Sequence, residues 1–145
     1  MGNYRDLIVW RRASDLAIRI HRATRRFPRQ GAPGLSAQLH RAVASIAANI
    51  AEGAGQQSDA QFVRFVNIAI GSANECASHL HLACSIGFVT PEEGAALLDE
   101  IVQIRRMLFG LRKHLENAGP HRSRLTTQPP APLTTDDSRL TTEAD

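Results

Sequence analysis

The 145-residue sequence is poor in aromatic residues and contains no long apolar run. Aromatic side chains make up 5% of the chain, too few for a platform on which single-stranded bases stack. No uninterrupted apolar stretch approaches the ~20 residues that span a bilayer, so no membrane partner is expected. The first ten residues carry charges and lack the apolar region of a secretory signal. These absences predict a soluble cytoplasmic protein.

Cysteine is equally scarce. Cys76 and Cys84 are the two in the chain. On one helix, eight residues would separate them by about 12 Å along the axis. A disulfide needs Cα atoms within about 7 Å of each other, so we expect both thiols to be free.

Positive charge is concentrated near the N-terminus. Residues 1–41 contain nine Arg and two Asp, which gives +7. Residues 42–118 give −3 and residues 119–145 give −1, which completes the net charge of +3. This asymmetry predicts a basic surface formed by the first quarter of the chain.

Helical periodicity recurs along the chain, whereas the alternation typical of strands is absent. We expect helices over residues 9–26, 35–52 and 58–86, and a fourth that starts after Thr90. Ser58 and Thr90 have the spacing of N-cap residues. Short turns between four helices predict an all-α fold, an antiparallel up-down four-helix bundle over residues 1–117.

The composition changes in residues 118–145, which are rich in Pro and Thr. We expect this segment to be a disordered tail. It contains three Leu-Thr-Thr repeats, at 125–127, 133–135 and 140–142. The repeats are compatible with a docking motif or with low-complexity sequence.

Arginines occupy the polar face of the first predicted helix, opposite its apolar seam. Guanidinium groups bind phosphate oxygens bidentately, so this face is the candidate nucleic-acid-binding surface. The alternative is a merely solvated face, although Ile18 lies within it and is compatible with contact to another subunit. The candidate phosphate contacts are Arg5, Arg11, Arg12, Arg19, Arg22, Arg25, Arg26 and Arg29.

Polar residues of the second and third helices form another constellation. Folding these helices about Gln57 would bring Arg41 near Glu75, and Glu52 near Arg64. We expect a partly buried structural network that sets helix register; a substrate site is the alternative. The full set is Arg41, Asn49, Glu52, Arg64, Ser72 and Glu75.

Catalytic and metal-binding motifs are weak. Glu75 and His79 share one helix face, but a bundle metal site needs a second Glu-x-x-His motif, which is absent. Gly53-x-Gly55 follows a helix, so it is interpreted as a turn rather than a phosphate loop. We therefore expect no metal, no cofactor and no enzyme activity.

Several stretches resemble the 23S rRNA intervening-sequence protein family, which includes the accessory variability protein of diversity-generating retroelements. The most specific run is Asn49-Ile50-Ala51-Glu52-Gly53, followed by Gly71-Ser72 and Glu75. The other matching stretches are Tyr4-Arg5-Asp6-Leu7 through Ala13, Phe27-Pro28, Gly34-Leu35 through Ile46, Phe62-Val63-Arg64-Phe65, and Met107-Leu108 with Gly110-Leu111. The resemblance covers residues 3–116.

The resemblance implies a non-catalytic bundle that forms ring-like homopentamers and binds nucleic acid through basic surface residues. A reverse transcriptase is a protein partner that it also suggests. Two positions depart from the family pattern. Ala47 stands where the family often has Pro, and His40 replaces the first member of a basic pair.

Two functions remain open on the sequence. The first is a basic homo-oligomer that binds the phosphate backbone of RNA or DNA without reading bases. The second is a protein-interaction scaffold that does not bind nucleic acid directly.

Overall fold

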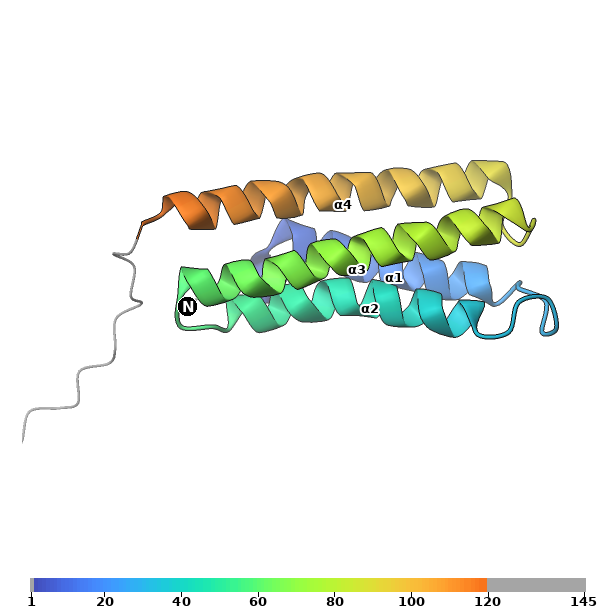
Figure 1. Cartoon of the computed structure of the whole chain (residues 1–145), viewed down its shortest axis with the longest axis horizontal. Helices are drawn as coiled ribbons and strands as arrows, with labels where there is room; N and C mark the ends of the chain where they lie inside the picture. The colour runs from blue at the N-terminus through green and yellow to red at the C-terminus, as the bar shows by residue number, and fades with distance from the viewer. Residues whose placement is uncertain (1, 120–145) are drawn as a thin grey trace, which may run out of the picture.

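The computed structural model describes residues 2–119, in which four helices run alternately up and down beside one another (Figure 1). The expected four-helix fold is confirmed. The tail beyond Gly119 and its Leu-Thr-Thr repeats lie outside the described residues. The elements are η1 (Tyr4–Asp6), α1 (Ile8–Thr24), α2 (Leu35–Ala54), α3 (Asp59–Ser85) and α4 (Pro91–Asn117).

Local capping fixes where α3 and α4 begin. The Ser58 hydroxyl accepts a hydrogen bond from the Gln61 backbone N–H at 3.2 Å. The Thr90 hydroxyl accepts one from the Glu93 backbone N–H, also at 3.2 Å. Each cap satisfies an amide that lacks a partner within its helix. Both predicted helix starts are confirmed.

The first helix differs from its expected bounds at both ends. It is preceded by the short 3-10 helix η1, where the Asn3 side chain accepts a hydrogen bond from the Arg5 N–H at 3.1 Å. It ends at Thr24, two residues before the predicted end. Pro28 disfavours helical backbone before it, and the chain leaves the helix through a turn.

An aliphatic core joins all four helices. The largest fully buried side chains include Leu16 of α1, Ile46 of α2, Leu80 of α3 and Ile104 of α4. With so few aromatic residues, the core is filled by Leu, Ile, Val and Ala, and the Ala-rich face of α2 lets its neighbours approach closely. None of the described helices combines the length and apolarity needed to cross a membrane.

Gly53 shows how closely α2 approaches α3. A Cβ atom at this position would lie 2.5 Å from Cδ2 of Phe62 and 2.9 Å from Cβ of Phe65. Gly53 is buried inside the last turn of α2, and Gly55 is the C-cap residue. The sequence-based interpretation of Gly53 as a turn residue is therefore wrong: the position needs Gly because two helices touch there.

The loop between α1 and α2 is fixed against the connection between α3 and α4. Phe27 packs on Phe88 with ring centroids 5.3 Å apart. Gly31 lies directly over the Phe88 ring, with no room for a side chain between them. This contact holds the α1–α2 loop at one end of the bundle.

We predict that Gly53→Ala destabilises the protein by about 1–3 kcal/mol, because the added methyl group overpacks the α2–α3 contact. Gly71→Ala is the matched control, since it also lies within a helix but has open space around its Cα. There the better helix propensity of Ala should stabilise the protein by about 0.5–1 kcal/mol. Urea unfolding of both variants measures the effect, and equal midpoints would contradict the close-contact interpretation.

Candidate nucleic-acid interface

Arg12, one of the eight candidate phosphate contacts, is held by a carboxylate. Its Nε and Nη2 atoms each donate to a carboxylate oxygen of Glu100 on α4, at 2.8 Å. This hydrogen bond, together with the nearby positive charge, lowers the pKa of Glu100 despite partial burial of the carboxylate. The bidentate pair ties α1 to α4 and uses the donors that a phosphate would need.

Two further arginines of this set also have partners within the protein. Arg26 contacts the Glu93 carboxylate, with its second hydrogen bond at 2.6 Å. Arg11 donates to the backbone carbonyls of Arg5 at 2.8 Å and Asp6 at 3.2 Å, which anchors η1 to α1. Part of the basic surface predicted from the sequence is thus used for contacts within the protein, which we call the arginine clasp: Arg11, Arg12 and Arg26 with their partners.

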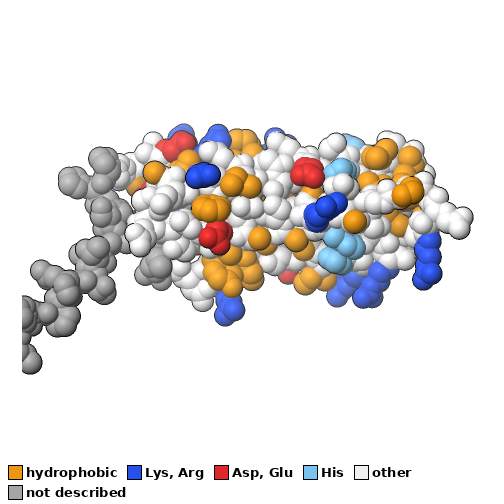
Figure 2. Space-filling view, turned by 60° about the horizontal axis from the view of Figure 1, so that its bottom comes forward, with side chains coloured by type: hydrophobic (Ala, Val, Ile, Leu, Met, Phe, Trp, Pro, Cys, Tyr) orange, Lys and Arg blue, Asp and Glu red, His pale blue; other side chains and the backbone are white. Residues whose placement is uncertain are grey.

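The side chains of the other five candidates form no hydrogen bond or ion pair within the described residues, although the Arg5 guanidinium lies over the Tyr4 ring. Arg19, Arg22, Arg25 and Arg29 are exposed, and none forms a hydrogen bond or ion pair within residues 2–119. We call these four residues the free-arginine surface. Figure 2 shows a group of basic side chains along one edge near the end of the bundle that carries the α1–α2 loop, and others toward the opposite end.

Acidic side chains are absent from this part of the sequence. Residues 16–51 contain six Arg and no Asp or Glu. Asp15 lies one helical turn before Arg19 on α1, and Glu100 on α4 is close enough to Arg19 for its charge to lower the pKa of that carboxylate. Glu92 and Glu93 begin α4 at the same end of the bundle as the α1–α2 loop (Figure 1). Glu93 is already paired with Arg26. The excess positive charge of the free-arginine surface is therefore greatest at Arg22, Arg25 and Arg29, beyond Arg19 along the chain.

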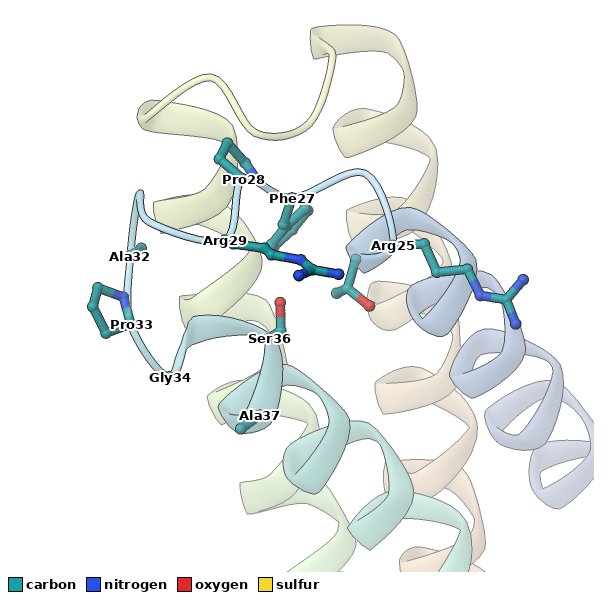
Figure 3. Close-up of a pocket in the computed structure, with 10 residues that line it drawn as sticks. Arg25, Phe27, Pro28, Arg29, Ala32, Pro33, Gly34, Ser36 and Ala37 are labelled. Atoms are coloured by element: carbon teal, nitrogen blue, oxygen red, sulfur yellow. The ribbon is translucent and has the colours of Figure 1, made fainter.

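A pocket of about 420 Å³ lies beside this surface, between the end of α1, the α1–α2 loop and the start of α2. Figure 3 shows the Arg29 side chain crossing it toward Ser36, whereas Arg25 points away. The Ser36 hydroxyl forms no hydrogen bond within residues 2–119. Polar donors without internal partners thus line the pocket, which suits an anion better than an apolar ligand.

His40 contributes no second positive charge here. Its ring stacks on His21 with centroids 3.8 Å apart, and its Nε2 lies 2.6 Å from the Thr24 hydroxyl. That hydroxyl donates to the His21 carbonyl, so His40 Nε2–H donates to Thr24. Burial, and secondly the neighbouring His21, lower the pKa of His40. The residue that departs from the family's basic pair is therefore neutral near pH 7.

The polar network predicted between α2 and α3 is present only in its neutral part. The Ser45 and Ser72 hydroxyls are 2.8 Å apart, and the Asn49 amide donates to the Ser45 carbonyl at 2.8 Å and to its hydroxyl at 2.9 Å. The sequence singled out Asn49 and Ser72 but missed Ser45, the residue that joins them. Its small polar side chain on the α2 face toward α3 was the available signal.

The charged part of that prediction is wrong. Arg41, Glu52, Arg64 and Glu75 are all exposed, and neither expected ion pair occurs among the described residues. Glu75 instead lies 3.4 Å from His79 on its own helix. Long charged side chains at the helix edges extend into water, where an exposed pair gains little.

The structure offers no concentration of reactive groups. Within residues 2–119, no group of three or more His, Cys, Asp or Glu side chains is placed to hold a metal ion. Cys76 is buried, which raises the pKa of its thiol to about 12, and Cys84 is also a free thiol. A thiol with so high a pKa is a poor nucleophile at neutral pH.

Comparison with known proteins gives a matching family model and similar solved structures. The model of the 23S rRNA-intervening sequence protein family matches residues 5–110. A crystal structure from Bacteroides thetaiotaomicron, of a protein with unknown function from the S23 ribosomal protein family, is 29% identical with a TM-score of 0.69. The match covers 73% of this chain and 99% of that one. No curated protein matches.

We predict that the Arg12–Glu100 pair contributes about 0.5–1 kcal/mol to folding, because Arg12 is partly exposed. A double-mutant cycle with Arg12→Gln and Glu100→Gln measures the coupling by urea unfolding. The pKa of Glu100 is lower in the folded protein, so the contribution is complete above about pH 4.5 and is lost as the pH falls further. A coupling energy of zero at pH 7 would show that the Arg12–Glu100 pair does not stabilise the fold.

We also predict that lowering the pH from 7 to 5 destabilises the protein through His40. Its folded pKa lies below the ordinary value of 6.5, so the unfolded chain binds the proton more readily. Stability is therefore lost as the pH falls through 6.5 toward the folded pKa. The His40→Gln variant should show a smaller change in unfolding midpoint than the parent, whereas His81→Gln on the exposed face of α3 should match the parent.

Proposed function

This chain belongs to the 23S rRNA-intervening sequence protein family, and on that premise we propose that it is a non-catalytic, oligomeric protein that binds the phosphate backbone of nucleic acid. The observation that carries the proposal is the free-arginine surface. Four exposed guanidinium groups without internal partners lie in a 36-residue stretch that lacks acidic residues. Such a surface binds phosphates by charge and shape rather than by base sequence.

The structure divides the eight candidate arginines into three paired residues, the four residues of the free-arginine surface, and Arg5. Arg11, Arg12 and Arg26 donate to groups of the protein itself. Moving them to a phosphate would break those contacts, so their share in binding should be small. Arg19, Arg22, Arg25 and Arg29 carry no such cost. Arg5 is exposed, with its guanidinium 5.6 Å from the centroid of the Tyr4 ring, and it lies in η1, at the other end of α1 from the α1–α2 loop.

Oligomer formation is the second part of the proposal. Ile68 and Leu82 on α3 are 43% and 49% exposed, although each is large and apolar. A single copy of the bundle therefore leaves apolar surface of α3 in water. A second copy packed on α3 would cover these side chains, and an oligomer would carry several free-arginine surfaces, which strengthens binding to a polyanion by multivalency.

A protein-interaction scaffold is the second candidate function, and the same exposed residues favour it. Ile68 and Leu82 are equally suited to a different protein chain, such as a reverse transcriptase. The two functions differ in their salt dependence. Phosphate binding weakens steeply with salt, whereas apolar docking does not.

We predict that the full-length protein binds a structured RNA and a duplex DNA at micromolar or lower concentration in 50 mM salt. Its log affinity should fall linearly with log salt. The triple variant Arg22→Gln, Arg25→Gln, Arg29→Gln should bind at least about tenfold more weakly, and its salt slope should fall by about 2–3. Fluorescence anisotropy measures both quantities.

The matched control is Arg64→Gln, Arg106→Gln, Lys113→Gln, which removes the same charge from exposed side chains elsewhere on the bundle. Its affinity should stay close to that of the parent. Light scattering before each titration gives the number of copies in the free protein. Equal losses in the two triple variants would mean that net charge, not this surface, is responsible, and absence of binding at 50 mM salt would leave the scaffold function.

A further inference from the structure

The free-arginine surface lacks a partner within residues 2–119, and the chain itself carries a segment of complementary charge. Residues 136–145 contain four acidic side chains and one Arg, a net charge of −3 over ten residues. Residues 120–135 between this segment and the bundle contain two Arg and no acid. Negative charge in the tail is thus confined to its last ten residues, while positive charge in the bundle is concentrated around the α1–α2 loop.

We propose that residues 136–145 dock on the free-arginine surface and compete there with nucleic acid. The acidic residues of the segment are Asp136, Asp137, Glu143 and Asp145. The docking contact follows from the charges, while its competitive role rests on the proposed function. Carboxylates and phosphates both bind guanidinium groups through paired oxygens, so they use the same donors.

The intervening chain is long enough for this contact. The C-terminal end of α4 lies at the opposite end of the bundle from the α1–α2 loop (Figure 1). The 27 residues of α4 span about 40 Å. Sixteen residues separate Gly119 from Asp136. At the ~3.1 Å per residue of extended proline-rich chain they would reach about 50 Å, and four of them are Pro.

Tethering makes a weak contact effective. Each exposed Arg–carboxylate pair is marginal by itself, and salt screens it. Attachment keeps the segment within reach of the surface, and its effective concentration is set by how far the linker must extend to span the bundle. The docked segment would raise the nucleic-acid concentration needed for half-saturation and leave the site open to a polyanion with many phosphates. Short or weakly charged ligands would bind poorly, because they would compete less well with the docked segment.

The contact can be tested without nucleic acid, because the sequence contains a single Lys, at position 113. Arg25→Lys and Arg29→Lys place amines on the free-arginine surface without changing its charge. A carbodiimide then joins amines directly to carboxylates that touch them. Mass spectrometry of the full chain should find cross-links from residues 136–145 to positions 25 and 29 at 50 mM salt, and few of them at 1 M salt.

The control is Arg106→Lys on the exposed side of α4, together with the natural Lys113. Both lie closer along the chain to the tail, so a tail without a docking site would cross-link to them more than to positions 25 and 29. That pattern would overturn the proposal. Mixing 14N-labelled and 15N-labelled protein shows whether the segment reaches its own bundle or that of a second copy.

The competitive role is tested by replacing the four acidic residues with Asn or Gln. The variant should bind the duplex DNA about 3–10-fold more tightly than the parent at 50 mM salt and equally at 300 mM. Replacing Thr126, Thr127, Thr134 and Thr135 with Asn is the matched control and should leave affinity unchanged. Cross-links without DNA binding would refute the proposed function and keep the docking contact, whereas binding without cross-links would refute only the contact.

Discussion

Burial of one aliphatic seam shared by four helices decides where every charge of this protein lies. Each helix turns Leu, Ile, Val or Ala toward the same core, so its charged side chains must lie at the edges or on the outside. The apolar seam of α1 therefore orients all of its arginines. Arg12, on the side nearest α4, meets the Glu100 carboxylate of that helix, whereas Arg19 and Arg22 extend from α1 without an ion pair. An interhelical ion pair and part of the free-arginine surface therefore arise from a single helix.

The arginine clasp shows why arginine position matters more than arginine number. Arg12 and Arg26 are two turns either side of Arg19, and all three share one stripe. Glu100 and Glu93 on α4 are two turns apart as well. Because α4 runs antiparallel to α1, Glu100 pairs with Arg12 and Glu93 pairs with Arg26, and Arg19 forms no ion pair with α4. Arg19 still contributes to the low pKa of Glu100 through its charge. The pairing follows from the helical repeat and from the relative direction of the two helices. Neither can be obtained from the amino-acid composition.

The end of the bundle that carries the α1–α2 loop combines rigidity with unbalanced charge. Phe27 and Phe88 fix the loop, the Thr24–His40 hydrogen bond fixes the first turns of α2, and neutral His40 keeps further positive charge out of the interior. The exposed arginines at this end are therefore attached to a backbone that packing holds in place. Such preorganisation lowers the entropy cost of ordering the backbone when an anion binds. The proposed docking of residues 136–145 would use the same surface, so nucleic-acid binding and its competitive inhibition would involve the same arginines.

The sequence by itself determined the helices and the fold class, because apolar spacing, Ser58, Thr90 and Pro91 act within a few residues of one another. It also located the basic part of the chain. Only the tertiary structure decided which arginines are free, that Gly53 is a contact point rather than a turn, and that Ser45 completes a network from which Arg41 and Glu75 are absent. These outcomes depend on which helix faces meet and at what register, to within an ångström. Residues close together in the sequence determine where a helix forms, whereas contacts between residues far apart in the sequence determine which helix faces pack together.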